Sequence, residues 1–304
     1  MKNEKEIVRL ELMQRGWFFF LPILLSLLTL TVPLCKDSTE NLSFYQSLIQ
    51  RLTEDGFDLS FVTRILGDPR AEYKPATLGI YLGAKEDPSR YEKFLRPESI
   101  LQAKSFLYEN LRVLKKMERR FQVDKEIVVA ILLIESRFGE NIGRHRVVPT
   151  LASLSLLNSQ ENLQRNYEVF REYLPDLSFE WLENFAKRRA EWAYHELKCF
   201  LKIILEERID PLEVYGSYAG ALGMAQFIPS SYINYALPSK GFEHWLLSKE
   251  DSINSIGNYL RANGWKRTLS LEGQKRVLWS YNRSEPYVET VLEIARRLKG
   301  RSSK

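Results

Sequence analysis

A glutamate, Glu135, stands at the end of the apolar run Ile127–Ile134. The run is apolar on every side, so it predicts a helix that is buried all round rather than an amphipathic surface helix. A carboxylate at the end of such a helix is partly desolvated, which raises its pKa towards the range where it donates a proton near neutral pH. The alternative is a glutamate that emerges into solvent where the helix ends.

A second group of polar residues lies in the segment 216–232, which reads GSYAGALGMAQFIPSSY. Its glycines permit tight turns and a close approach of the backbone to a ligand. Its amide, its hydroxyls and its aromatic rings are the groups that proteins use to bind sugars. The residues of interest are the glycines Gly216, Gly220 and Gly223 with Ser217 and Gln226.

Acidic residues are absent from the two stretches that are expected to face Glu135, residues 141–160 and 214–242. Ordinary glycosidases need two carboxylates, one as acid and one as nucleophile or base. A site with a single acid needs another source for its nucleophile. The segment Trp279–Val288 adds Asn282 between Tyr281 and Tyr287 and is able to complete a saccharide cleft, although Tyr-Asn before a helix is also common turn chemistry.

Helical periodicity dominates the chain beyond residue 40, and strand-like alternation is scarce. The pattern predicts a mainly α protein, with a helical lead-in over residues 36–96 and a catalytic body over 97–300. The expected helices cover residues 44–52, 59–66, 97–121, 125–135, 158–205, 249–263 and 286–298.

Residues 1–35 have the features of an export segment. An uncharged stretch over residues 16–34 follows four basic residues, and Cys35 comes directly after it. Three interpretations stay open: a lipoprotein with lipid on Cys35, an uncleaved membrane anchor, and plain secretion. Each of them places the body outside the cytoplasm, in the periplasm or cell envelope.

Composition excludes several other classes of protein. Lysine and arginine number 44 against 39 acidic residues, a net charge of +5, but acids are interleaved with the bases, so no nucleic-acid partner is expected. Two cysteines make no disulfide framework, and three distant histidines show no ligand spacing. We therefore expect neither a metal nor a cofactor.

Six segments occur in the order found in the B-type membrane-bound lytic murein transglycosylases, which this chain resembles from about Phe44 to its C-terminus. The resemblance implies a lysozyme-like α fold that acts on peptidoglycan glycan strands. The segments are Glu135–Gly139, Thr150–Ser155, Arg188–Trp192, Gly216–Tyr232, Ile256–Trp265 and Tyr281–Tyr287.

The same resemblance implies roles for individual residues. Glu135 would protonate the glycosidic oxygen between N-acetylmuramic acid and N-acetylglucosamine. It would then take the proton from the muramic C6 hydroxyl, which attacks C1 to form a 1,6-anhydro sugar. Ser217 matches a serine that hydrogen-bonds the acid, and Arg188 and Arg189 match a basic pair for the anionic stem peptide, unless they are only a solvated helix start. The residues that match glycan contacts are Gln226, Tyr281, Asn282 and Tyr287.

The chain also departs from the family pattern. An aromatic-rich insertion over residues 157–187 is expected to form an added helical pair with a core of its own, and it is a candidate surface for cell-wall protein partners. The segment Leu237–Trp245 lacks the alternating oxygen ligands of a calcium loop, and Met224–Ala225 replaces an aromatic-glycine pair. Two alternative functions stay open: a hydrolytic muramidase, and a non-catalytic peptidoglycan-binding or scaffold protein.

Overall fold

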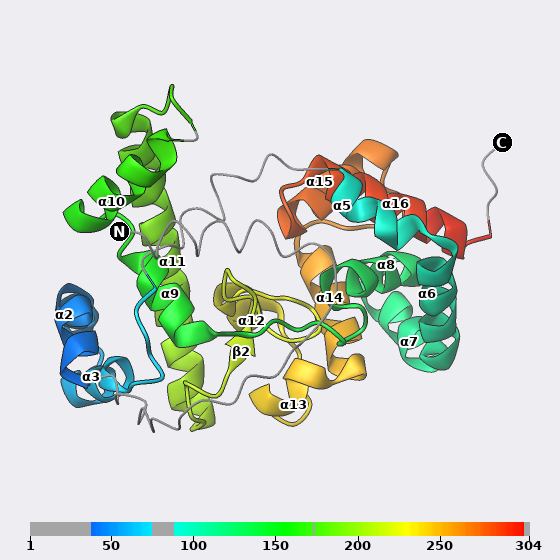
Figure 1. Cartoon of the computed structure of the whole chain (residues 1–304). Coiled ribbons are helices and arrows are strands. Elements are labelled where there is room, and N and C mark those ends of the chain that lie inside the picture. Colours follow the sequence, from blue (N-terminus) through cyan, green and yellow to red (C-terminus); the bar gives the residue numbers. More distant parts are fainter. Residues whose placement is uncertain (1–37, 75–87, 173, 301–304) are drawn as a thin grey trace, which may run out of the picture. The chain divides into compact units, whose positions relative to one another are not determined.

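Helices make up most of the computed structural model, which describes residues 38–74, 88–172 and 174–300 (Figure 1). The predicted mainly α fold is confirmed. The helices are α2 (Ser38–Glu54), α3 (Leu59–Gly67), α5 (Ser89–Glu92), η2 (Lys93–Leu95), α6 (Pro97–Glu109), α7 (Leu111–Phe121), α8 (Lys125–Ser136), α9 (Val147–Ser155), α10 (Gln160–Arg171), α11 (Phe179–Glu207), α12 (Pro229–Tyr235), α13 (Phe242–Leu247), α14 (Lys249–Ala262), α15 (Leu271–Tyr281) and α16 (Glu285–Leu298).

The N-terminal predictions, an export signal or anchor over residues 1–35 and a lipid on Cys35, lie outside the described residues. No helix in the described ranges is long and apolar enough to cross a membrane. The described residues belong to a unit that begins at Lys36 and has its own hydrophobic core.

Helix α8 forms the centre of that core. Its side chains are buried from Glu126 to Leu133, as the all-apolar sequence predicts. Helices α6, α7, α14 and α16 contact α8, and α7 also packs on α14 (Figure 1). Helix α8, which carries Glu135, is thereby enclosed by the two helices that precede it and by two helices from the C-terminal part of the chain.

The predicted helix over residues 97–121 is interrupted at Asn110, where the chain leaves helical geometry with φ −105° and ψ 17°. The Asn110 side-chain amide donates to the Phe106 carbonyl, and its backbone N–H does the same. An asparagine side chain that bonds nearby backbone competes with regular helix formation. The single predicted helix therefore becomes α6 and α7.

A short antiparallel ladder joins the two acid-free stretches. Strand β1 (His145–Arg146) pairs with β2 (Tyr215–Gly216), and His145 lies opposite Gly216. Isolated bridges then connect Gly216 to Leu222 and Leu222 to Phe227. The glycine-rich segment thus folds back on itself beside the chain that follows Glu135.

The insertion forms a helical pair, as expected, from α10 and the first third of α11. It has a small apolar cluster of its own, which includes Leu163 and Leu182, and the rings of Tyr167, Phe170 and Phe185 pack on it. The boundaries 36–96, 97–300 and 157–187 remain predictions.

Candidate active site

Glu135 lies one residue before the last residue of α8, where the backbone reverses sharply. Arg137, Phe138 and Gly139 all have positive φ, at 49°, 61° and 98°. Two consecutive non-glycine residues in this region are strained, and such strain persists only where the surroundings hold it. Here the Phe138 ring stacks on Phe106 with centroids 4.1 Å apart, and the Phe138 N–H donates to the Leu132 carbonyl. The reversal leaves the Glu135 side chain at the edge of the core.

The carboxyl of Glu135 has the raised pKa that the sequence predicts. The side chain is half-buried, and burial raises its pKa to about 7 from an ordinary value of 4.5, while Tyr287 acts in the opposite direction. No other carboxylate contributes to the pKa of Glu135 among the described residues. A carboxyl with this pKa is able to donate a proton and take one back near neutral pH.

Two tyrosines lie parallel next to Glu135. The rings of Tyr281 and Tyr287 stack with centroids 6.5 Å apart, and the charge of Glu135 together with burial raises the pKa of both hydroxyls. The Tyr281 hydroxyl donates to the Ala225 carbonyl at 2.5 Å. The Tyr287 hydroxyl is buried beside Glu135 but reaches no hydrogen bond of standard geometry within the described part of the chain. Tyr287 therefore keeps a proton available for the carboxylate.

The predicted close approach of the glycine segment is present, but its partner is the protein's own backbone. A Cβ on Gly216 would lie 2.3 Å from the Ala221 carbonyl oxygen, and Gly220 and Gly223 have positive φ with close neighbours. Sequence reasoning missed Gly143, at which a Cβ would lie 2.0 Å from the Gly216 carbonyl carbon. The sequence feature that points to Gly143 is its position in the acid-free stretch 141–160, which follows Glu135.

Ser217 is held by the turn that follows β2. Its hydroxyl oxygen accepts the N–H groups of Ala219 and Ala221 at 3.1 and 3.0 Å. Two accepted bonds use the oxygen's acceptor capacity, so the hydroxyl proton remains for donation. The implied bond from Ser217 to Glu135 is untested and stays a prediction.

Gln226 fastens the glycine segment to the chain beyond α8. Its side-chain nitrogen donates to the carbonyls of Ile142 and Gly223 at 3.1 and 2.8 Å, which leaves the amide oxygen as the group for a ligand. Ser136, which sequence reasoning also missed, donates to the Met224 carbonyl at 2.8 Å. These bonds place Gln226 and Glu135 on two segments that are fixed to each other.

The other predicted residues lie in different surroundings. Asn282 caps the C-terminus of α15 and is half-buried, next to Tyr281. Arg188 is exposed on α11, and the Arg189 guanidinium lies 4.0 Å from the centre of the Trp192 ring. The structure thus brings Glu135, Tyr281 and Tyr287 together. The Arg189 guanidinium, in contrast, contacts Trp192, a residue of the same helix α11.

Comparison with known proteins identifies the family of the chain. The Transglycosylase SLT domain matches residues 40–274, which is most of the chain. The chain belongs to this family. The membrane-bound lytic murein transglycosylase B of Escherichia coli (strain K12) is 30% identical over 226 residues, which cover 73% of this chain. They cover 54% of the relative, so the chain spans about half the length of the curated relative it matches.

Solved structures of lytic transglycosylases share the fold. The soluble lytic transglycosylase SltB1 of Pseudomonas aeruginosa superposes with a TM-score of 0.66 at 22% identity, over 84% of this chain and 99% of that one. SltB3 of the same organism, solved with NAG-anhNAM-pentapeptide, gives a TM-score of 0.64 at 21% identity, over 87% and 80% of the two chains. The likeness confirms the lysozyme-like lytic transglycosylase fold that the sequence predicts.

The lytic transglycosylase SLT35 of Escherichia coli was solved in complex with calcium, but the acidic residues of this chain do not fit such a site. Asp251 accepts bonds from the backbone N–H and the hydroxyl of Ser239 at 3.0 and 3.1 Å, so protein donors already satisfy its carboxylate. In the described ranges, the acidic group with metal-like spacing is Glu118, Asp124 and Glu126. Lys125 pairs with both of its glutamates, so cations of the protein neutralise that group.

Calcium is therefore expected to leave stability unchanged. A site with a Kd one hundredfold below the calcium concentration adds about 2.7 kcal/mol, which moves Tm by several degrees. We expect no shift between excess chelator and millimolar calcium in calorimetry. A saturable rise in Tm with calcium, absent with magnesium, would show that the loop binds the ion after all.

The two stacked tyrosines give a matched pair of variants. In Tyr287→Phe the group that lowers the pKa of Glu135 is lost, so this pKa should rise above about 7, as followed by NMR titration of the side-chain carboxyl. Below about pH 4.5, where Glu135 is neutral, stability should not fall, because a buried hydroxyl without a standard hydrogen bond is removed; above pH 7 it should fall, because the ionised carboxylate loses the stabilising effect of Tyr287.

Tyr281→Phe is the control for Tyr287→Phe. It leaves the Ala225 carbonyl without its donor, so unfolding free energy should fall by about 1–3 kcal/mol while the pKa of Glu135 stays in place. Equal pKa changes in the two variants would mean that ring packing, and not the Tyr287 hydroxyl, sets the pKa of Glu135.

Proposed function

We propose that the protein is a lytic transglycosylase that cleaves the β-1,4 bond between N-acetylmuramic acid and N-acetylglucosamine in peptidoglycan, leaving 1,6-anhydromuramic acid ends. The observation that carries the proposal is Glu135, a half-buried carboxyl with a pKa of about 7 on which no second carboxylate acts within the described part of the chain. Membership of the Transglycosylase SLT domain family supports the same reaction class.

In the first step, neutral Glu135 donates its proton to the glycosidic oxygen while the bond from that oxygen to C1 breaks. N-acetylglucosamine leaves as an alcohol, and the substrate's N-acetyl group steadies the positive charge at C1. A pKa of about 7 leaves the proton on a large share of molecules at neutral pH.

In the second step, the Glu135 carboxylate takes the proton of the muramic C6 hydroxyl. The C6 oxygen then forms its bond to C1 and closes the anhydro ring, so the carboxyl ends in the form in which it began and no water is consumed. The substrate supplies the nucleophile, which accounts for a site with one acid. Tyr287 stabilises the carboxylate between the steps, since its hydroxyl lies beside Glu135 and lowers the pKa of that carboxyl.

The remaining cleft roles belong to the same proposal. Ser217 donates to Glu135, the oxygen of Gln226 and the amide of Asn282 contact the glycan, and Arg188 and Arg189 meet the stem peptide. We also propose that the chain is exported to the periplasm or cell envelope and held at the membrane through residues 1–35. The relative from Escherichia coli is named membrane-bound, which supports this location.

Mass analysis of the products tests the proposal. Purified sacculi are digested to completion, and each muropeptide is expected to have one water less than its hydrolytic counterpart and no reducing end. A product with a reducing end would make the enzyme a hydrolytic muramidase. Stable binding to sacculi without any release would make the protein a binding or scaffold protein on the same fold.

A further inference from the structure

The outer face of α7 is strongly basic. Its five exposed cations recur every three to four residues, which places them on one side of the helix. The one acid of α7, Glu118, turns inward to Lys125, and none of the five cations is held in an ion pair within the described residues. The five are Arg112, Lys115, Lys116, Arg119 and Arg120.

Helix α6 continues this surface with apolar side chains. Tyr108 and Leu101 are the two most exposed large apolar residues in the described ranges, at 80% and 69%, and they lie two turns apart on α6. Lys104 lies between them and is exposed. Two exposed acids belong to α6: Glu98 in its first turn, and Glu109, which accepts a bond from Ser105.

The two helices meet at Asn110, which keeps the hydrogen-bond spacing of a helix. Asn110 donates its N–H to Phe106, and its carbonyl accepts the N–H of Leu114. Tyr108 and Arg112 are therefore about one turn apart. We call the exposed residues of the two helices the basic face. It consists of Leu101, Lys104, Tyr108, Arg112, Lys115, Lys116, Arg119 and Arg120.

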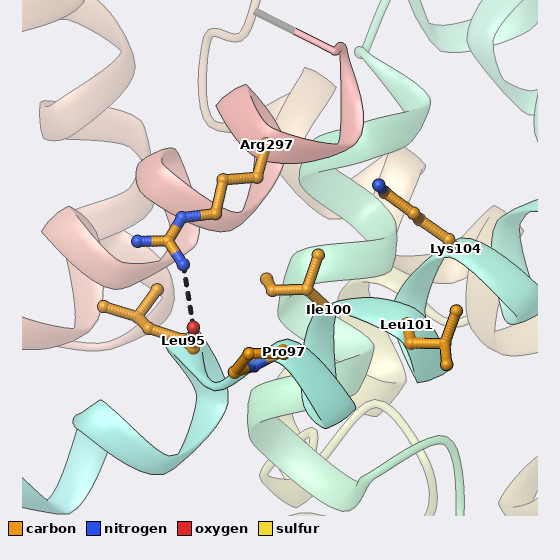
Figure 2. Close-up of a pocket in the computed structure, with 6 residues that line it drawn as sticks. All are labelled: Leu95, Pro97, Ile100, Leu101, Lys104 and Arg297. Carbon is orange, nitrogen blue, oxygen red and sulfur yellow. Dashed lines mark hydrogen bonds between the residues drawn. The ribbon is translucent and has the colours of Figure 1, made fainter. Parts of the chain in front are cut away.

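A shallow groove of about 460 Å³ adjoins the basic face and shares Leu101 and Lys104 with it. Figure 2 shows Arg297 reaching from α16 towards the Leu95 carbonyl, to which it donates at 2.7 Å, with Lys104 and Leu101 on α6 across the groove. The lining is thus mostly apolar, with two cations at its rim.

The basic face lies on the exposed sides of α6 and α7, whereas the buried sides of both helices pack towards α8. Its cations are not among the groups that act on the pKa of Glu135, which are burial and Tyr287.

We infer that the basic face is a docking surface for a bilayer that contains anionic lipids. Lysine and arginine are attracted to anionic headgroups, and tyrosine and leucine enter the boundary between headgroups and acyl chains. A nucleic acid or an anionic wall polymer would bind the cations, but it has no acyl chains that could contact Leu101, Tyr108 and the apolar groove. The combination of charge with exposed apolar groups favours the bilayer.

The test uses the full chain in nanodiscs of neutral lipid or of lipid with an anionic fraction, so that both accept the N-terminal segment and differ only in charge. An amine-reactive reagent labels exposed lysines, and mass spectrometry follows each site. We expect labelling of Lys104, Lys115 and Lys116 to be about tenfold slower in anionic discs. Labelling of the exposed Lys202 and Lys240 should be equal in both discs. About 1 M salt should remove the difference, because charges are then screened within about 3 Å.

A charge-reversal variant makes the assignment specific. Lys115→Glu, Lys116→Glu and Arg119→Glu together should abolish the protection of Lys104. The control combines Lys202→Glu, Arg208→Glu and Lys240→Glu, which change the net charge equally from other exposed positions, and it should keep the protection.

Three results would overturn the inference. The first is equal labelling of wild-type Lys104, Lys115 and Lys116 in both discs, which decides the matter even if the variant fails to fold. The second is equal loss of protection in the control, which would reflect net charge alone. The third is a face variant that loses binding to sacculi while lipid protection is unchanged, which would assign the face to the wall polymer.

Discussion

Glu135→Gln is expected to lower the rate of anhydromuropeptide release from purified sacculi by about 10²–10⁴-fold, the range that a general acid–base group contributes. Glutamine keeps the shape and the hydrogen-bonding oxygen but has no proton to give to the glycosidic oxygen. Because burial and Tyr287 are the causes that set the pKa of Glu135, no neighbouring carboxylate stands ready to replace it among the described residues. Release at the wild-type rate would refute the role of Glu135.

Glu140→Gln is the matched control. Glu140 is five residues further along and exposed, with a bond from Gln102, so the same chemical change there should leave the rate of release unchanged. Similar losses in the two variants would point to a general effect of charge near the cleft.

Glu135→Gln should also change stability in a pH-dependent way. The folded-state pKa of Glu135 is raised to about 7, so the contribution of Glu135 to wild-type stability is fully present below about pH 4.5 and is lost as pH rises to 7. A shift of this size corresponds to about 3 kcal/mol. Because glutamine does not ionise, Glu135→Gln should gain on wild type by up to this amount between pH 4.5 and 7, with no further gain above, as measured by urea unfolding.

The sequence was informative wherever one local rule decides the structure. The all-apolar run predicts the buried helix α8, and the position of Glu135 at the end of that run predicts the burial that raises its pKa. Helical periodicity gave most of the helix positions, because burial of an apolar stripe imposes that period. The six ordered segments gave the family, which the matched domain confirms.

What the sequence could not give are contacts between segments that are distant in the chain. Nothing local shows that Tyr281 donates to Ala225, or that the nitrogen of Gln226 is used by Ile142 and Gly223. Such contacts decide which polar atoms remain for a ligand. The side-chain bond that splits α6 from α7 at Asn110 was likewise hidden, since asparagine in a helical pattern is common.

The glycines around the cleft show how these distant contacts shape the site. Gly143 and Gly216 face each other across the start of the β1–β2 ladder, and a Cβ on Gly143 would lie 2.0 Å from both the carbon and the oxygen of the Gly216 carbonyl. Backbone cannot yield as a flexible side chain does. The close approach also includes Ser217, the next residue, whose backbone nitrogen would lie 2.5 Å from the same Cβ.

Gly143→Ala is therefore expected to lower the unfolding free energy by about 3 kcal/mol or more. Positive φ costs alanine about 1–2 kcal/mol, and overpacking against fixed backbone costs about 1–3 kcal/mol further. Anhydromuropeptide release should fall as well, because the displaced ladder carries Ser217 with it. Urea unfolding and the digestion of sacculi measure the two effects.

Gly264→Ala separates the two causes. Gly264 follows α14 with φ +97°, almost the φ of +98° at Gly143, but a Cβ there meets nothing within 4 Å. Both variants thus place alanine at almost the same φ, and their difference in unfolding free energy measures the clash with Gly216. Equal losses in the two variants would mean that the ladder moves aside at little cost, and that the position of Ser217 does not depend on this contact.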